Sequence, residues 1–257
     1  NPTIFEKDSW KDNIHEQMFL ATFNYEKDIY VRSCKLFPDA STLIVGGETK
    51  TICILDVERG EIKTTFDCEA EACYALAISQ DCKLCFSCCS SGVVNVWDLQ
   101  SGERITQLVG HSDGANNTVR CWDIGAREQI DSQILESQVF CIDCCPNDEM
   151  LAVGLENDNI HVLNSKTLDK NYLLTGHESC VLSLKFANSG KASFNYCNWF
   201  VSAGKDKVVN CWNAANGFDL VKNKEANSVL SCEISDDDSF LLTGSGDKKA
   251  SLYKLTF

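Results

Sequence analysis

His177, Ser202 and Asp206 are the residues of this chain whose types most directly suggest chemistry. A serine hydroxyl activated by a histidine, with an aspartate to orient the ring, is the nucleophile of many hydrolases. These residues belong to one unit of an internal repeat, however. In another unit, the positions of the serine and the aspartate hold Val45 and Thr49. Valine cannot act as a nucleophile, so we expect a structural role for this group and no catalysis.

Sixteen cysteines are unusual for a chain of 257 residues. Four of them are spaced like metal ligands, namely Cys82, Cys85, Cys88 and Cys89. We nevertheless expect no metal, because Cys88 and Cys89 are neighbours in a predicted strand and must point to opposite faces. The cysteines within residues 141–145 also lie on a single predicted strand. The sequence therefore predicts buried structural thiols and neither a metal nor another cofactor.

The elements that must position these residues follow from an internal repeat. Five times, a small residue is followed four positions later by a turn residue, and six positions after that by a bulky residue. The sets are Val45–Thr49–Leu55, Ser87–Ser91–Trp97, Val153–Asn157–Leu163, Ser202–Asp206–Trp212 and Thr243–Asp247–Tyr253. An interval of about 40 residues between bulky members is typical of stacked repeats. Because one unit alone has too little core to fold, function must come from the surface that the units build together.

Each unit predicts four short strands. It opens with an alternating β-branched or aromatic run, at residues 31–37, 73–79, 139–145, 181–186 and 229–235. A turn follows, then a second strand ending in small residues, a third strand with the bulky residue, and a weaker fourth strand. Four antiparallel strands in about 40 residues describe one blade of a β-propeller, so the sequence predicts an all-β propeller.

The intervals between the bulky residues indicate which blades are complete. Trp97 and Trp122 are only about 25 residues apart, so the unit at Trp122 keeps its last two strands and lacks the first two. Leu163 and Trp212 are about 49 residues apart, which places an insertion near residues 191–197. We therefore expect about six blades, five full repeats and one half repeat, where seven blades are common.

Two regions are distinguished along the chain. Residues 1–28 form a divergent N-terminal segment that fits no complete unit, and residues 29–257 form the propeller. The last unit ends after its third strand, so we expect residues 18–23 (MFLATF) to supply its fourth strand and to leave no long open edge. The half blade is a predicted weak point.

Composition excludes several classes of function. The formal net charge is −14, and a chain this acidic repels nucleic-acid phosphates and anionic lipid surfaces. No apolar run approaches the roughly 18–20 residues that span a bilayer, and the N-terminus does not resemble a signal peptide. Cysteines inside strand-like runs indicate a reducing compartment, the cytosol or the nucleus.

One position of the repeat indicates binding. The first strand of each propeller blade lines the central channel, and the residue after each strand-opening position should lie at one depth. These residues are Arg32, Tyr74, Phe140, Leu182 and Leu230. Four are large and apolar although such a rim has no core to fill, which favours a binding pocket for an apolar anchor with a carboxylate or carbonyl for the arginine. The alternative is that they merely plug a narrowed channel.

The motifs resemble those of WD-repeat proteins. Trp97-Asp98 and Trp122-Asp123 match the WD dipeptide, and Gly110-His111 and Gly176-His177 match the GH dipeptide. Longer runs such as YVRSCKLFPD, KLCFSCCSSG, LAVGLE, VLSLKF and TGSGDKKA, spread over roughly residues 29–257, are similar to the C-terminal propeller of the Groucho/transducin-like enhancer-of-split (TLE) corepressors.

This resemblance implies a non-enzymatic transcriptional corepressor in the nucleus, acting on Wnt-type and developmental targets. It implies no direct contact with nucleic acid or membrane, and recruitment by DNA-bound repressors through Trp-Arg-Pro-Trp or engrailed-homology peptides. The family's oligomerisation segment is expected to be absent. The resemblance places peptide-binding residues at Tyr30, Arg32, Glu48, Leu182 and Leu230, to which the repeat adds Tyr74 and Phe140. It also implies that His177, Ser202, Asp206 and Trp212 form a structural hydrogen-bond network.

Two alternatives remain from the sequence. A generic WD-repeat adaptor that binds through its sides would show unrelated, charged residues at the five channel positions. A truncated, non-functional product is suggested by the halved blade, and a cooperative thermal melt would argue against it.

Overall fold

The computed structural model describes residues 30–111, 117–188 and 199–255, and within them every regular element is a strand. The strands are β1 Val31–Leu36, β2 Thr42–Gly47, β3 Thr51–Asp56, β4 Glu61–Asp67, β5 Cys73–Ile78, β6 Leu84–Cys89, β7 Val93–Asp98, β8 Arg104–Val109, β9 Thr118–Asp123, β10 Glu128–Ile134, β11 Val139–Cys144, β12 Met150–Leu155, β13 Ile160–Asn164, β14 Lys170–Leu174, β15 Val181–Phe186, β16 Trp199–Gly204, β17 Val208–Asn213, β18 Asp219–Lys224, β19 Val229–Ile234, β20 Phe240–Ser245 and β21 Lys249–Lys254. The described part of the chain contains no helix that is long and apolar enough to cross a membrane.

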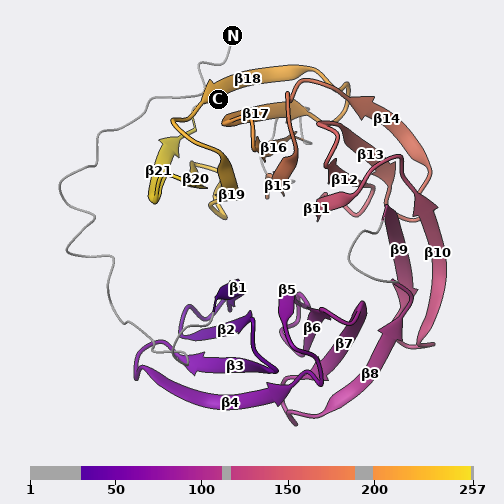
Figure 1. Ribbon diagram of the computed structural model, residues 1–257, viewed down its shortest axis with the longest axis vertical. Helices are drawn as coiled ribbons and strands as arrows, with labels where there is room; N and C mark the ends of the chain where they lie inside the picture. The colour runs from indigo at the N-terminus through magenta and orange to yellow at the C-terminus, as the bar shows by residue number, and fades with distance from the viewer. Residues whose placement is uncertain (1–29, 112–116, 189–198, 256–257) are drawn as a thin grey trace. The chain divides into compact units, whose positions relative to one another are not determined.

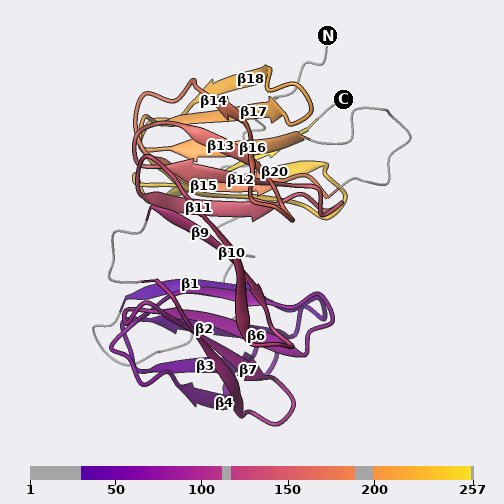
Figure 2. The ribbon, with the colours of Figure 1, turned by 90° about the vertical axis from the view of Figure 1, so that its right-hand side faces the viewer.

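The strands pair into antiparallel sheets of sequence neighbours (Figures 1 and 2). Four sheets have four strands, β1–β4, β5–β8, β11–β14 and β15–β18, and the sheet β19–β21 has three within the described residues. The sheet of β9 and β10 has two strands there. The predicted all-β propeller, incomplete relative to seven blades, with five repeats and one half repeat, is therefore confirmed.

The chain divides into two compact units. Among the described residues, the N-terminal unit comprises 30–111 and 122–130, and the C-terminal unit comprises 117–121, 131–188 and 199–255. Within each unit the first strands of successive blades are neighbours, β1 beside β5 in one, and β11 beside β15 beside β19 in the other (Figure 1).

The core of each unit lies between adjacent sheets. In the N-terminal unit, Ile52 and Phe66 of the first blade pack with Cys85 and Trp97 of the second. In the C-terminal unit the blades of β11–β14 and β15–β18 share one cluster, and those of β15–β18 and β19–β21 share another. The five predicted bulky residues, Leu55, Trp97, Leu163, Trp212 and Tyr253, are each at most 4% exposed. Their recurrence therefore reflects the burial that joins one blade to the next.

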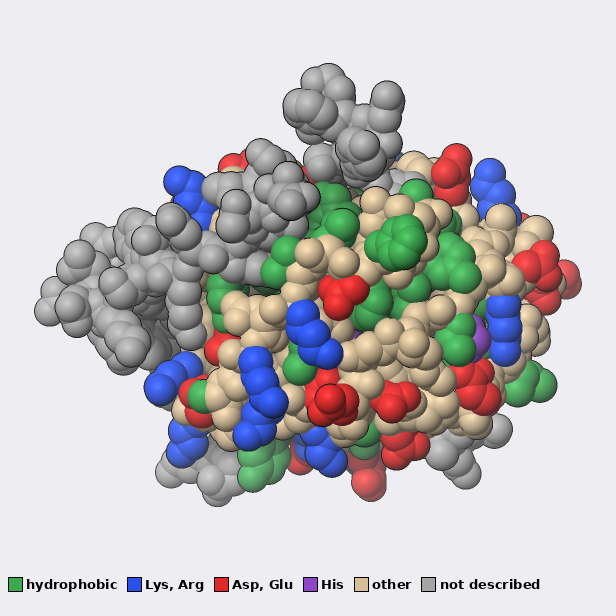
Figure 3. Space-filling view, turned by 90° about the horizontal axis from the view of Figure 1, so that it is seen from above, with side chains coloured by type: hydrophobic (Ala, Val, Ile, Leu, Met, Phe, Trp, Pro, Cys, Tyr) green, Lys and Arg blue, Asp and Glu red, His purple; other side chains and the backbone are tan. Residues whose placement is uncertain are grey.

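On the face seen in Figure 3, side chains of Lys, Arg, Asp and Glu lie among apolar side chains. Several large apolar residues outside the first strands are exposed too, among them Phe218 just before β18 and Leu173 of β14. Exposed apolar residues are ordinary on the surface of a folded protein. The predicted closing strand at 18–23 and the insertion at 191–197 lie outside the described residues, and both stay predictions.

Candidate functional site

The five channel positions predicted from the repeat share a local backbone irregularity. In β1 the register passes from the pair Val31–Gly47 to the pair Ser33–Gly46, so Arg32 has no partner across the ladder. The same interruption isolates the equivalent residue of the other four first strands, namely Tyr74, Phe140, Leu182 and Leu230. A β-bulge bends the strand and redirects the side chain of the extra residue. Each of these five first strands thus displaces one side chain from the regular ladder.

Regular alternation in the first strands, as the sequence suggested, is therefore not what the structure contains. In β15 the buried residues are Val181, Leu184 and Phe186, with spacings of three and then two. In β19 they are Val229, Cys232 and Ile234, with the same spacings. Strict alternation would give a spacing of two throughout. The apolar residues of the sequence carry the same change of interval, which signals an irregular strand, but only the strand pairing shows that the irregularity is a bulge at Leu182 and Leu230.

In the N-terminal unit, three site residues form one polar group. The Arg32 Nε donates to Glu48 Oε1 at 3.0 Å, and a second, shorter contact joins the Arg32 Nη2 to the same oxygen. The Arg32 guanidinium also lies over the Tyr30 ring, 5.6 Å from its centroid, in cation–π range. The hydrogen bond and charge of Glu48 raise the pKa of Arg32, with smaller contributions from Tyr74 and Tyr30. Arg32 is thus a fixed, accessible cation, with a side chain 48% exposed.

Gly47 permits this arrangement. The Glu48 N–H donates to the Tyr30 carbonyl oxygen at 3.0 Å, which brings the two backbones together. A Cβ on Gly47 would lie 2.2 Å from that same carbonyl oxygen, closer than real Cβ atoms come to backbone. The second glycine of the Gly46-Gly47-Glu48 run therefore provides the space in which Tyr30 approaches Glu48. Sequence reasoning assigned Glu48 to the site and gave Gly47 no role there.

In the C-terminal unit the site residues are apolar and lie on three neighbouring first strands. Phe140 of β11 is 42% exposed and Leu230 of β19 is 55% exposed, while Leu182 of β15 is partly exposed. Side chains bridge these strands, since the Phe186 N–H donates to Asp143 Oδ2 at 2.7 Å. The unit thus presents an apolar row, defined as Phe140, Leu182 and Leu230. The remaining predicted site residues, Tyr30, Arg32, Glu48 and Tyr74, belong to the N-terminal unit.

The four residues expected to form a structural network contact one another in the C-terminal unit. Trp212 Nε1 donates to Ser202 Oγ at 2.8 Å, and Ser202 Oγ lies 2.7 Å from His177 Nε2. His177 Nδ1 lies 2.9 Å from Asp206 Oδ2, which also accepts from the Glu178 N–H. A neutral histidine protonated on Nδ1 satisfies every one of these bonds. Ser202 is fully buried, so its hydroxyl is not accessible to a substrate.

Burial of His177 predicts a dependence of stability on pH. Desolvation lowers the pKa of His177, and the nearby Asp206 opposes this shift without cancelling it. Above the ordinary histidine pKa of about 6.5 the ring is neutral in both states and its contribution is complete. As the pH falls below that value the unfolded chain takes up the proton first, so stability is lost until the lowered folded-state pKa is passed.

We expect the free energy of unfolding to fall more between pH 7.5 and 5.5 in the wild type than in His177→Gln. Urea denaturation at three pH values measures both slopes, and comparing slopes removes the constant cost of the substitution. Equal slopes in the two proteins would contradict a lowered pKa for His177.

Other blades fill the equivalent positions with different chemistry. In the last blade Glu225 stands four residues before Val229, as His177 stands four before Val181. Glu225 is buried and contacts both the Tyr253 hydroxyl and Thr243 Oγ1. The Glu225 carboxylate thus takes the place of the histidine ring, and the Tyr253 phenol takes the place of the tryptophan indole. The polar atom of the buried aromatic residue therefore still has a hydrogen-bond partner.

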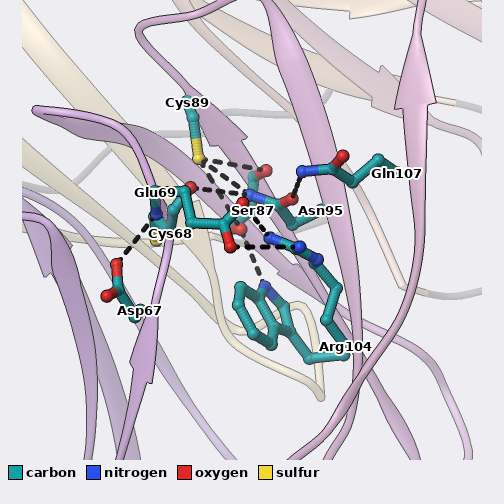
Figure 4. A network of polar contacts seen from close by, with 9 residues as sticks. Asp67, Cys68, Glu69, Ser87, Cys89, Asn95, Arg104 and Gln107 are labelled. Atoms are coloured by element: carbon teal, nitrogen blue, oxygen red, sulfur yellow. Dashed lines mark hydrogen bonds and ion pairs between the residues drawn. The ribbon is translucent and has the colours of Figure 1, made fainter.

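The second blade keeps the indole–serine contact only. Trp97 Nε1 donates to Ser87 Oγ at 2.9 Å, while the histidine position holds Glu69, which pairs with Arg104 at 2.8 Å (Figure 4). The Arg104 guanidinium lies 5.9 Å from the centroid of the Trp97 ring. Buried Asn95 donates to Cys89 Sγ at 3.3 Å in the same network. Different blades therefore use different residues to satisfy the hydrogen-bonding groups at these buried positions.

The cysteines that are spaced like metal ligands differ in their exposure. Cys85 and Cys89 are buried, whereas their neighbour Cys88 is exposed on the opposite face of β6. Burial raises the pKa of Cys85 to about 12, which keeps this thiol protonated and unreactive. Among the residues that the structure describes, no three His, Cys, Asp or Glu side chains are arranged to hold a metal ion. Every described cysteine is a free thiol.

The sequence of this chain is similar to those of known proteins. Residues 24–254 match the family model of a β-propeller described as "Nucleolar protein 10-like, N-terminal domain". The chain belongs to this β-propeller family. It is also 45% identical over 250 residues to Transducin-like enhancer protein 2 of Mus musculus, an alignment that covers 90% of this chain and 32% of the relative. The propeller thus spans about a third of that relative's length, and its resemblance to the Groucho/TLE proteins is confirmed.

Proposed function

We propose that this β-propeller is a non-enzymatic transcriptional corepressor domain that binds short peptide motifs of DNA-bound repressors in the nucleus. The observation that carries the proposal is the repeated bulge, which presents Arg32, Tyr74, Phe140, Leu182 and Leu230 at equivalent positions. Identity of 45% to a Transducin-like enhancer protein supports it. Wnt-type and developmental targets belong to the proposal, as the resemblance implies.

The side chains at these positions suit a peptide with aromatic or aliphatic anchors. The C-terminal unit offers exposed apolar surface at Phe140 and Leu230. The N-terminal unit offers the exposed Tyr74 ring and, in Tyr30, Arg32 and Glu48, a charged group with fixed geometry. Arg32 can pair with a carboxylate or donate to a carbonyl oxygen of the peptide. Catalysis is not part of the proposal, because the group of Ser202, His177 and Asp206 is buried and serves the blade core.

The expected affinity is moderate. Burying one tryptophan removes about 150–250 Å² from water, which at about 25 cal/mol per Å² stabilises the complex by about 4–6 kcal/mol. Two such anchors must offset an association cost of about 4–15 kcal/mol. The balance is compatible with a dissociation constant near micromolar, which suits reversible recruitment.

Titration of a labelled peptide ending in Trp-Arg-Pro-Trp, followed by fluorescence, tests the proposal. We expect saturable binding that weakens at least tenfold, about 1.4 kcal/mol, in Arg32→Ala and in Leu230→Asp. Matched controls are Arg59→Ala, on an exposed turn, and Leu220→Asp, on β18, both of which should bind as the wild type does. Unchanged affinity in both site variants, with cooperative melts retained, would disprove this site.

A further inference from the structure

A second row of side chains lies beyond the apolar row on the same three strands. Three positions after Phe140, Leu182 and Leu230 stand Asp143 of β11, Lys185 of β15 and Glu233 of β19, which we call the charged row. These strands are held side by side, because Ser183 Oγ of β15 accepts from the Cys232 N–H of β19 at 3.1 Å. The charged row therefore follows the apolar row across three blades of one unit.

The charged row is linked internally and is not neutral. Lys185 Nζ lies 3.2 Å from Glu233 Oε1 and 3.9 Å from Asp143 Oδ1, so one ammonium serves two carboxylates. Asp143 also accepts the backbone N–H of Phe186. The side chains of Asp143 and Lys185 are 25% and 24% exposed, whereas that of Glu233 is 57% exposed. The excess negative charge is thus accessible to a ligand at Glu233.

The distance between the rows fits one peptide. Three residues along a strand span about 10 Å, and one residue of an extended peptide covers about 3.5 Å. A lysine or arginine next to an anchor that rests on Leu230 can bridge the remaining distance with its long side chain. The net charge of −14 adds a long-range attraction for such a ligand and disfavours an anionic one.

We infer that the charged row makes the site selective for peptides that carry a basic side chain next to an aromatic or aliphatic anchor. Glu233 is the contact residue, and Lys185 and Asp143 hold it and its strand in place. This inference rests on the proposed function, because it assigns charge selectivity to the same peptide site.

Charge exchange between peptide and protein tests the inference. Three labelled peptides ending in Trp-Arg-Pro-Trp, Trp-Gln-Pro-Trp and Trp-Glu-Pro-Trp are titrated against wild type, Glu233→Gln and Glu233→Lys. Burial raises the pKa of Asp143, and the charge of Lys185 partly offsets this shift. The titrations are therefore run at pH 7.5, well above the ordinary pKa of a carboxyl group. Glu103→Gln, an exposed change of equal charge in the other unit, is the matched control.

We expect the wild type to bind the arginine peptide about 3- to 10-fold more tightly than the glutamine peptide, and the glutamate peptide most weakly. Glu233→Gln should remove most of this difference, Glu233→Lys should reverse it, and Glu103→Gln should preserve it. The preference should also shrink as salt is raised from 50 to 500 mM.

Two negative results are distinguishable. Saturable binding of all three peptides with equal affinity in the wild type, or a preference that Glu233→Lys leaves unchanged, overturns the charge selectivity and leaves the proposed function standing. An absence of saturable binding for every peptide overturns the proposed function and this inference with it.

Discussion

Replacing Trp212 by alanine is expected to lower the free energy of unfolding by about 3–5 kcal/mol, the range found for removing a large aromatic from a core. Trp212 is 2% exposed and lies in the cluster that joins the blades of β11–β14 and β15–β18. Its ring lies 6.5 Å from that of Phe200, and its Nε1 donates to Ser202. The substitution therefore leaves a cavity and breaks a buried hydrogen-bond network at once.

Urea denaturation followed by far-ultraviolet circular dichroism measures this effect without depending on tryptophan fluorescence. Trp122→Ala is the matched control, because Trp122 in the half blade is only partly buried. Its expected cost is about 1 kcal/mol, in the range of an ordinary substitution. Equal destabilisation by the two variants would contradict a special contribution of Trp212 to the interface between the blades of β11–β14 and β15–β18.

Gly47→Ala is expected to weaken peptide binding at least tenfold and to destabilise the first blade by about 1–3 kcal/mol, as overpacking does. The added methyl group would overlap the Tyr30 carbonyl oxygen, which is backbone and cannot rotate away. Either β2 or Tyr30 must move, and Tyr30 and Glu48 would separate. Arg32 would then lose the geometry that both of its neighbours provide.

The same peptide titration and a thermal melt of Gly47→Ala measure binding and folding separately. Gly246→Ala is the control, since the nearest atoms to a Cβ there belong to Asn227 at 3.6–3.7 Å, an ordinary contact distance. Wild-type affinity in Gly47→Ala would show that the Tyr30–Glu48 contact does not organise the site.

Burial imposes a pattern on the sequence, and this pattern explains what could be predicted. A residue such as Trp212 or Tyr253 recurs at a fixed register because each blade must cover the next, so strands, blade order and the half blade could be counted from the chain. The five equivalent first-strand positions followed from the same register. The resemblance added Tyr30 and Glu48, which no periodicity distinguishes.

Other features depend on contacts between residues distant in sequence. Glu225 and Tyr253 fill the positions that His177 and Trp212 fill in another blade. Their contact is visible only in the folded structure, because the two residues lie 28 positions apart in the sequence. Likewise, Asp143, Lys185 and Glu233 are unremarkable surface charges until three blades stand side by side.

By itself, the sequence determined the all-β class, the repeat, the blades that are complete and the residues that share one position in each. Only the tertiary structure decided that those residues sit on bulges, that Gly47 makes room for Tyr30, and that one ammonium is shared by two carboxylates. The physical reason is that burial acts on every residue in turn and leaves a periodic trace in the chain. Bulges, close backbone approaches and ion pairs depend on distances between particular atoms, and residue types alone do not fix those distances.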